Sequence, residues 1–408
     1  MNISSASAGA APESASLKSW LAVWSIALGS FVVVTSEFLP IGLLTNISGG
    51  LGVSDGIAGL MVSIPGIVAA IAAPAMTVFA GKVDRRILVL TLMALLAGSN
   101  LIAALAPNFA VMLVARVLFG ICLGGFWTIA VTLGGRLVPK SSMARATTLI
   151  MAGISIATVA GVPVGKVIAD VSSWRFAFGV IGFVALIAGG IQLFVLPKLS
   201  APPAPGFHQL TALLHHADAR LGLLTVALVI GGHFAAYTYV TPFLNQNPQM
   251  NPGFLSSLLL AFGVAGIFGN FLGGAMAGRN LRATLGTVVV LLVTSVALLP
   301  FFRDPLLGTS ALVLVWGLAF GAIPIVLQLW VFKAAPDALE GGAALMVSTF
   351  QIFIALGSVL GGRVVDAFGP SAVMWGGGGT AAIALVIVAL SRSHLKKPAT
   401  VEESCCEA

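Results

Sequence analysis

The chain has 408 residues, of which 58% are hydrophobic and only 8% are charged. An ordinary soluble domain carries roughly 25% charged residues, so this composition excludes a soluble enzyme. The formal net charge of +7 follows from basic residues concentrated on one side of a membrane, as described below, and gives no support to nucleic-acid binding.

Apolar runs long enough to cross a hydrocarbon core of about 30 Å recur along the whole chain. They lack the polar alternation of a barrel wall, and isolated strands would leave backbone groups unpaired in lipid, so we predict helices. In chain order the twelve expected spans are 20–44, 56–79, 87–106, 109–133, 146–170, 176–196, 221–244, 254–278, 283–302, 306–331, 340–366 and 371–391. The sequence therefore predicts an all-α membrane protein.

The basic residues fall mainly on one side of these spans. Fifteen of the 20 Lys and Arg lie in loops on the side of both termini, whereas Arg175, Arg303 and Arg363 lie on the opposite side. Cytoplasmic loops are enriched in Lys and Arg, so both termini are expected in the cytoplasm. The expected parts of the chain are a tail at 1–19, a six-helix bundle at 20–196, a linker at 197–220, a second six-helix bundle at 221–391 and a tail at 392–408.

An offset of 197 residues aligns the two bundles. It places Arg85 on Arg282 and Lys166 on Arg363, together with several small residues. Six helices repeated in the same orientation describe a parallel repeat about an axis normal to the membrane. We therefore expect two pseudo-repeats.

Several motifs give the chain a resemblance to a known family. They are GKVDRR at 81–86, RVLFGICLGG at 116–125, GVPVG at 161–165 and WRFAF at 174–178. The first resembles a shortened form, with one Gly fewer, of the loop signature of the major facilitator superfamily, and the second is similar to its Arg-and-glycine signature. The last two resemble a signature of proton antiporters that expel drugs and metabolites. SEFLPIGLLTNI at 36–47, GGFWT at 124–128 and GGHFAAYTYVTPF at 231–243 are similar to the branch of bacterial sugar-efflux and purine-ribonucleoside-efflux permeases.

One glutamate, Glu37, interrupts an otherwise uncharged run in the segment TSEFLPIGLL at 35–44. At a rise of about 1.5 Å per residue it lies in the outer half of the membrane, at the same depth as Arg116 on a helix of opposite direction. We expect these two residues to pair, directly or through water, and the carboxyl group to exchange its proton as the cavity alternates. The alternatives are a fixed structural ion pair, or a glutamate that snorkels to the outer interface. Asp55 is expected only to cap a helix.

Two further motifs are candidates for conformational roles. In the loop, Gly81 permits a tight turn, and Asp84 can accept from a facing helix N-terminus or pair with an arginine such as Arg85 or Arg86. In the superfamily such a contact latches the outward-open state. The alternative is an ordinary turn whose basic residues only set the orientation of the chain in the membrane.

The fifth span is expected to contain a hinge. Gly161, Pro163 and Gly165 allow close helix approach and a bend, and the resemblance implies a seal against proton leak. Packing of small residues without a further role is the alternative.

The substrate cavity is expected near the midplane of each half. His233 and Tyr237 lie one turn apart on one face of the seventh span, where they could hydrogen-bond and stack on a polar ring. A buried core histidine is the alternative. The other polar or aromatic candidates are Gln351, nearest to mid-depth, and Phe126, Trp127, Asn270 and Gln328, nearer to the cytoplasmic ends. Interhelical hydrogen bonding or interface anchoring is their alternative role.

These features favour a proton-coupled antiporter in the bacterial inner (plasma) membrane that exports a small polar or amphipathic solute, purine ribonucleoside or sugar-like, by alternating access. A multidrug or chloramphenicol-type pump is the alternative, and a receptor or channel on the same scaffold is the remote one. The sequence contains no GxxxxGK[ST] loop, catalytic set or metal-ligand cluster within the spans, so we expect no enzyme activity and no cofactor or metal besides the coupling proton. The expected partners are the solute and the lipid bilayer, and we expect a monomer.

Overall fold

The computed structural model describes residues 16–79, 83–139, 142–199, 217–302, 306–334 and 339–390. Within these ranges the chain is helical, with short turns and no strand. Most of the two expected tails, most of the linker and Gly81 lie outside them. An all-α fold therefore holds for the described part of the chain.

The helix ends fall close to those expected from the lengths of the apolar runs. The first half contains α1 (Leu17–Gly42), α2 (Leu44–Leu51), α3 (Asp55–Ala58), α4 (Leu60–Phe79), α5 (Arg85–Ala104), α6 (Phe109–Leu137), α7 (Met143–Ile156), the π-helical turn η3 (Ala157–Gly161), α8 (Val162–Val171) and α9 (Trp174–Val195). The second half contains α11 (Ala217–Tyr237), α12 (Val240–Leu244), α13 (Pro252–Leu298), the 3₁₀ turn η4 (Leu299–Phe302), α14 (Leu306–Ala334), α15 (Leu339–Phe368) and α16 (Pro370–Leu390).

Eleven helical stretches of the described residues are long and apolar enough to cross a membrane. One of them runs 51 residues from Pro252 to Phe302, whereas a single crossing needs about 20. Asn280, with φ −151° and ψ 92°, breaks the helical backbone inside α13. The expectation of twelve crossings thus depends on counting this stretch as two, divided at Asn280.

Side-chain caps mark the starts of several helices. Ser54 Oγ accepts from the Ile57 amide at 3.1 Å and begins α3. The prediction that Asp55 caps this helix is wrong, because Ser54 has the extended backbone (φ −68°, ψ 158°) that an N-cap requires. Asp55 is the first helical residue, and its carboxylate accepts from Ser48 Oγ at 2.5 Å.

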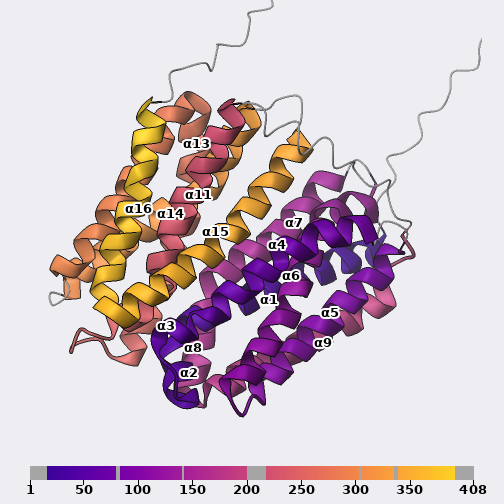
Figure 1. Cartoon of the computed structure of the whole chain (residues 1–408). Helices are drawn as coiled ribbons and strands as arrows, with labels where there is room; N and C mark the ends of the chain where they lie inside the picture. Colours follow the sequence, from indigo (N-terminus) through magenta and orange to yellow (C-terminus); the bar gives the residue numbers. More distant parts are fainter. Residues whose placement is uncertain are drawn as a thin grey trace, which may run out of the picture.

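The helices pack as two groups that meet mainly along two seams, with smaller contacts of α12 with α1 and α2 (Figure 1). The helices α1 to α9 contact mainly one another, and so do α11 to α16. We define the first seam as α15 against α3 and α4, and the second seam as α13 against α8 and η3. In Figure 1 the two groups come together near α3 and α8, in the lower part of the view. Of the candidate site residues, Gln351 lies on α15 at the first seam, and Gly161 and Pro163 lie on η3 and α8 at the second seam.

Candidate functional site

Glu37 lies on α1 and is buried, with 7% of its surface exposed. Its hydrogen-bond partner comes from the other half of the chain, because Gln351 of α15 donates from Nε2 to Glu37 Oε1 at 3.2 Å. Gln351 is also buried, and its Oε1 has no hydrogen-bond partner among the described residues. An amide of the second half therefore holds a carboxyl group of the first half.

Arg116 of α6 lies beside Glu37 without a direct ion pair. Its Nε donates to the Met61 carbonyl at 2.8 Å and its Nη1 to the Ser36 carbonyl at 3.1 Å, while the guanidinium carbon lies 4.4 Å from the centre of the Phe119 ring. Its Nη2 has no partner in the described part of the chain. Since Ser36 precedes Glu37, the two charged residues share a depth. Pairing through water stays a prediction.

The direct ion pair found among the described residues is Lys166 with Asp170, one turn apart on α8. Lys166 is 5% exposed, and its Nζ also lies 3.4 Å from Oδ1 of Asn46 on α2. A buried cation in a membrane span is costly unless a partner neutralises it. This charge is therefore balanced within the first half.

His233 of α11 lies in a cluster of aromatic side chains. Trp316 Nε1 of α14 donates to His233 Nδ1 at 3.0 Å, so the neutral imidazole carries its proton on Nε2. That Nε2 is buried and has no partner among the described residues. The imidazole stacks on Phe320, with ring centres 3.6 Å apart, and on Tyr237 at 5.1 Å. The stacking surface expected at His233 is thus filled by the protein's own rings in this state.

The aromatic cluster extends to the first half through Phe38, the neighbour of Glu37. Its ring stacks on Phe234 of α11 with centres 6.0 Å apart. Phe234 is 1% exposed, whereas Phe38 and Phe320 are half-buried and leave ring surface free. None of these three rings was among the residues predicted for the cavity, although Phe38 and Phe234 directly follow the predicted residues Glu37 and His233.

The remaining predicted cavity residues lie elsewhere. Phe126 is buried, Trp127 and Gln328 are half-buried and Asn270 is exposed. Within the described part of the chain, none of these four forms a hydrogen bond or ring contact with Glu37, Arg116 or His233. Their assignment to a cavity stays a prediction.

Asp84 caps α5 and also holds the segment that follows α9. Its Oδ1 accepts from the amides of Arg86 at 2.8 Å and Leu199 at 3.2 Å, and these two bonds lower the pKa of the Asp84 carboxyl group. The Arg85 amide donates to the Leu199 carbonyl at 2.9 Å, and Arg86 Nη2 to the Leu193 carbonyl at 2.6 Å. In this state the loop binds the start of the linker, and its role as a latch between the halves stays a prediction.

The predicted hinge residues pack closely against α1. The π-helical turn ends at Gly161, where an added Cβ would lie 2.9 Å from Thr35 Oγ1. A Cβ on Gly165 would collide with Leu39, and Pro163 lies in the first turn of α8. The residues therefore fill the packing role that was the alternative reading, and bending at this point stays a prediction.

A second carboxylate, Asp366, crosses the first seam at the end of α15. Its Oδ2 accepts from Ser54 Oγ at 2.7 Å and its Oδ1 from the Gly56 amide at 3.0 Å. Two turns earlier on α15, Ser358 Oγ donates to the Gly59 carbonyl at 3.0 Å. No role was predicted for Asp366, because nothing in the sequence indicates that Asp366 and Ser54, 312 positions apart, lie in contact.

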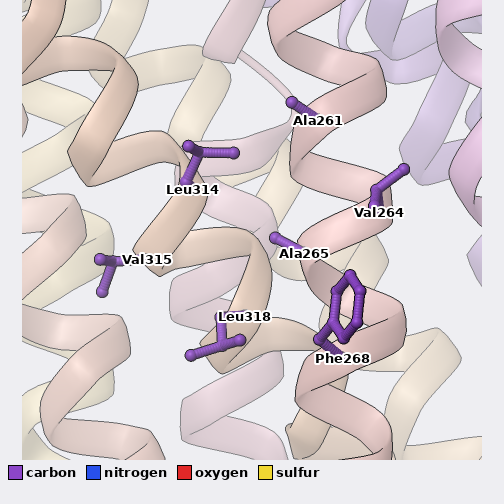
Figure 2. A pocket seen from close by; sticks show the side chains of 7 residues that line it. All are labelled: Ala261, Val264, Ala265, Phe268, Leu314, Val315 and Leu318. Carbon is purple, nitrogen blue, oxygen red and sulfur yellow. The ribbon is translucent and has the colours of Figure 1, made fainter.

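A pocket of about 460 Å³ opens between α13 and α14 (Figure 2). Its lining is entirely apolar and consists of Ala261, Val264, Ala265, Phe268, Leu314, Val315 and Leu318. Phe268 is 60% exposed and Val264 is 40% exposed. Because no polar group is present to orient a polar solute, we interpret this pocket as a lipid-facing groove.

The sequence and the fold match a known family. The family model for sequences of the Major Facilitator Superfamily matches residues 26–344 of this chain. The chain belongs to the Major Facilitator Superfamily. This confirms the family that the sequence motifs indicate, and it makes the chain a multi-pass membrane transporter of this superfamily.

Several superfamily relatives match nearly the whole chain. It is 35% identical over 389 residues to the "Transcription regulatory protein OpdE" of Pseudomonas aeruginosa, covering 93% of this chain and 96% of that one. It is 30% identical over 363 residues to a "Probable sugar efflux transporter" of Helicobacter pylori, with 89% and 93% covered. It is 28% identical over 370 residues to the "Purine ribonucleoside efflux pump NepI" of Salmonella paratyphi A, with 91% and 93% covered.

A solved structure shares the superfamily fold. It is the crystal structure of a bacterial homologue of the human lysosomal transporter Spinster, with a TM-score of 0.75 at 14% identity, covering 92% of this chain and 96% of that one. At this identity the likeness concerns the fold alone.

Proposed function

We propose that this protein is a proton-coupled antiporter of the bacterial inner membrane that exports a small polar or amphipathic solute, of the purine ribonucleoside or sugar kind, by alternating access. The observation that carries the proposal is Glu37, a buried carboxyl group on α1 that is hydrogen-bonded across the two halves. The efflux functions named for two relatives support export as the direction of transport.

Proton exchange at Glu37 follows from the cost of a charge in hydrocarbon. An ionised side chain inside a membrane span costs at least a few kcal/mol unless partners or water stabilise it. Glu37 has one hydrogen bond, from Gln351, and the charge of Arg116 nearby. A change in either contact as the halves move changes the preference between the ionised and the protonated carboxyl group. That dependence is what couples a proton to transport.

The solute would contact the half-buried rings beside Glu37. Phe38 and Phe320 offer ring surface, and Glu37 and Gln351 offer polar groups near it. Aromatic surface next to a few hydrogen-bonding groups suits a planar base or a sugar ring, which have an apolar face and polar edges. One buried carboxyl group and neutral neighbours suit a phosphorylated solute poorly.

In this state the hydrogen bonds of Asp366 and Ser358 join the two halves near one end of the molecule. If both termini are cytoplasmic, the hydrogen bonds of Asp366 and Ser358 across the first seam lie at the outer end. The described state would then be closed to the outside. Alternating access requires these bonds to break when the site opens outward.

Reconstituted vesicles test this proposal. A pH-sensitive dye reports proton movement while purine ribonucleosides, sugars and cationic drugs are screened for a solute that dissipates an imposed proton gradient. We expect a saturable, proton-dependent flux that Glu37→Gln abolishes. Asp55→Asn is the matched control, since it removes a carboxylate on the outer turn and keeps exchange. Undiminished exchange in Glu37→Gln would refute the proposal, and flux of drugs alone would favour a drug pump.

A regulatory role is a second candidate, because the relative from Pseudomonas aeruginosa is named a transcription regulatory protein. Against it, the longest polar stretch between the two expected bundles is 197–220, which is too short for a separate DNA-binding domain. Solute binding without any flux in the vesicle assay would favour the regulatory role.

A further inference from the structure

We infer that Gln351 is the positioning residue of the proton site, and that it holds the carboxyl group of Glu37 in both protonation states while α15 is packed against α4. This inference rests on the proposed function. It gives Gln351 a role at the proton, in addition to the polar surface that its side chain offers to the solute.

The amide of Gln351 can serve either form of the carboxyl group. Its Nε2 donates to Glu37 Oε1 at 3.2 Å, which satisfies the ionised form, and its buried Oε1 has no partner among the described residues. A protonated carboxyl group needs one acceptor for its O–H and can keep one donor on its other oxygen. A primary amide presents both groups side by side, so Gln351 Oε1 is the acceptor for the proton that Glu37 gains.

Arg116 does not take over this task. A guanidinium group only donates hydrogen bonds, so it cannot accept the O–H of the protonated carboxyl group. Its Nε and Nη1 are engaged by the Met61 and Ser36 carbonyls, its Nη2 has no partner among the described residues, and its charge acts on Glu37 without a direct ion pair. The described parts of α1 and α4 contain no other ionisable side chain near this depth, and Lys166 of α8 is paired with Asp170. Gln351 is thus the neutral partner and Arg116 the charged neighbour.

The position of Gln351 depends on close packing of the two halves. A Cβ on Gly66 of α4 would lie 2.8 Å from the Gln351 carbonyl oxygen and 3.2 Å from Ala355 Cβ, so only a glycine lets α15 approach this closely. A hydrogen bond weakens steeply beyond about 3.5 Å. Separation of α15 from α4 by one or two ångströms therefore removes the amide from Glu37. The carboxyl group then exchanges its proton with water on the side that has opened.

Infrared titration of the carboxyl group tests this role without any solute. The purified protein is titrated in lipid, and the acid carbonyl band of Glu37 is assigned from its loss in Glu37→Gln. In Gln351→Met the ionised form loses its donor and the protonated form loses its acceptor. Because the bond to the ionised form is charge-assisted and the stronger of the two, we expect the band to be half-titrated about one pH unit higher. An unchanged midpoint would overturn the inference. The matched control is Gln192→Met, since Gln192 is a buried glutamine of α9 that donates to the Ser25 carbonyl. That substitution should alter stability and leave the midpoint in place.

An exchange of the two side chains provides a second test, which does not depend on Gln351→Met folding well. Gln351→Glu alone places two carboxyl groups within hydrogen-bonding distance, and we expect them to share one proton over a wide pH range. Adding Glu37→Gln restores one acid and one amide with their helices exchanged. We expect this double variant to show a single midpoint within about one pH unit of the unaltered protein. A double variant that titrates like the single one contradicts the inference.

The proposed function and the role of Gln351 can be refuted separately. If Glu37→Gln keeps proton-dependent flux, the proposed function fails. If Glu37→Gln abolishes flux but Gln351→Met changes neither the infrared midpoint nor the pH profile of flux, only the role of Gln351 fails.

Discussion

The two seams between the halves are built from different contacts. Across the first seam, Gln351, Ser358 and Asp366 of α15 each form a side-chain hydrogen bond to the first half. Across the second seam, no side-chain hydrogen bond is found among the described residues, and α13 approaches the π-helical turn at Gly263 and Val159. The first seam combines close packing, as at Gly66, with side-chain hydrogen bonds, whereas the second seam consists of close backbone packing without such bonds among the described residues.

The difference indicates which seam opens more easily. A hydrogen bond between the halves can be exchanged for a bond to water when the surface is exposed, so its net contribution is small. Close packing of backbone against backbone gains only dispersion contacts, and it tolerates little change in shape. We therefore expect the first seam to act as the gate, and the second seam to act as the fixed contact about which the halves rotate.

The largest effect is expected from filling the second seam. A Cβ on Gly263 would lie 2.6 Å from the Val159 Cα atom, so Gly263→Ala forces two backbones apart. Overpacking of this kind costs about 1–3 kcal/mol, and we expect a lower melting temperature and a loss of transport. Gly286→Ala is the control on the same helix, because nothing lies within 4 Å of its added Cβ. Equal stability of the two variants would show that this seam is not tightly packed.

A smaller effect is expected from removing the hydrogen bonds of the Asp366 carboxylate across the first seam. Asp366→Ala removes the acceptor for Ser54 Oγ and the Gly56 amide, so the outer end should open more often. The measurement is labelling of Ala58→Cys, a buried seam position, by a membrane-impermeant reagent in a variant without the three native cysteines. Hydrogen bonds to a charged group contribute about 1.5–3 kcal/mol, so we expect labelling about tenfold faster or more.

Asp55→Asn is the control for this labelling experiment, since Asp55 bonds to Ser48 within its own half. It should leave the labelling rate unchanged. If Asp366→Ala labels no faster than this control, Asp366 does not hold the seam closed.

A neutral bond in the same seam should matter less. Ser358→Ala removes the hydroxyl that donates to the Gly59 carbonyl. Neutral hydrogen bonds contribute about 0.5–1.5 kcal/mol, so labelling at position 58 should rise by about twofold to tenfold and stay below that of Asp366→Ala. The reverse order would mean that the hydroxyl, and not the carboxylate, controls the gate.

The smallest effect on either seam is expected at Asp84, whose hydrogen bonds reach only Arg86 and the start of the linker at Leu199. Asp84→Ala should speed hydrogen exchange of the Leu199 amide at neutral pH and leave labelling at position 58 unchanged. The amide bonds lower the pKa of Asp84, so the contact is present above the ordinary carboxyl pKa of about 3.9 and is lost as the pH falls through the lowered value. Faster labelling at position 58 in this variant would show that the loop also controls the seam.

The sequence predicted the helices well, because an apolar run long enough to cross the membrane has few other stable structures. It also placed Glu37 and Arg116 at one depth, since depth follows from the rise per residue alone. The Ser36 carbonyl that binds Arg116 agrees with that arithmetic.

The hydrogen-bond partners of Glu37 and Arg116 could not be predicted from the sequence. Depth does not determine which face of a helix meets which neighbour, so Glu37 was expected to pair with Arg116, directly or through water, and its hydrogen bond with Gln351 was not predicted. Asp366 was missed for the same reason, because its contact depends on how α15 packs against a turn in the other half. The cap was assigned to Asp55 because a carboxylate is a common cap, while the backbone geometry selects Ser54.

The ion pair of Lys166 and Asp170 has a consequence for the electrical behaviour of the transporter. Moving one elementary charge through a potential of 100 mV costs about 2.3 kcal/mol, so any net charge on a moving helix makes the cycle voltage-dependent. Both members of this pair lie on α8, which contacts α13 at the second seam. In the proposed rocking motion the helix carries them together as a neutral unit, so the membrane potential exerts no net force on the pair.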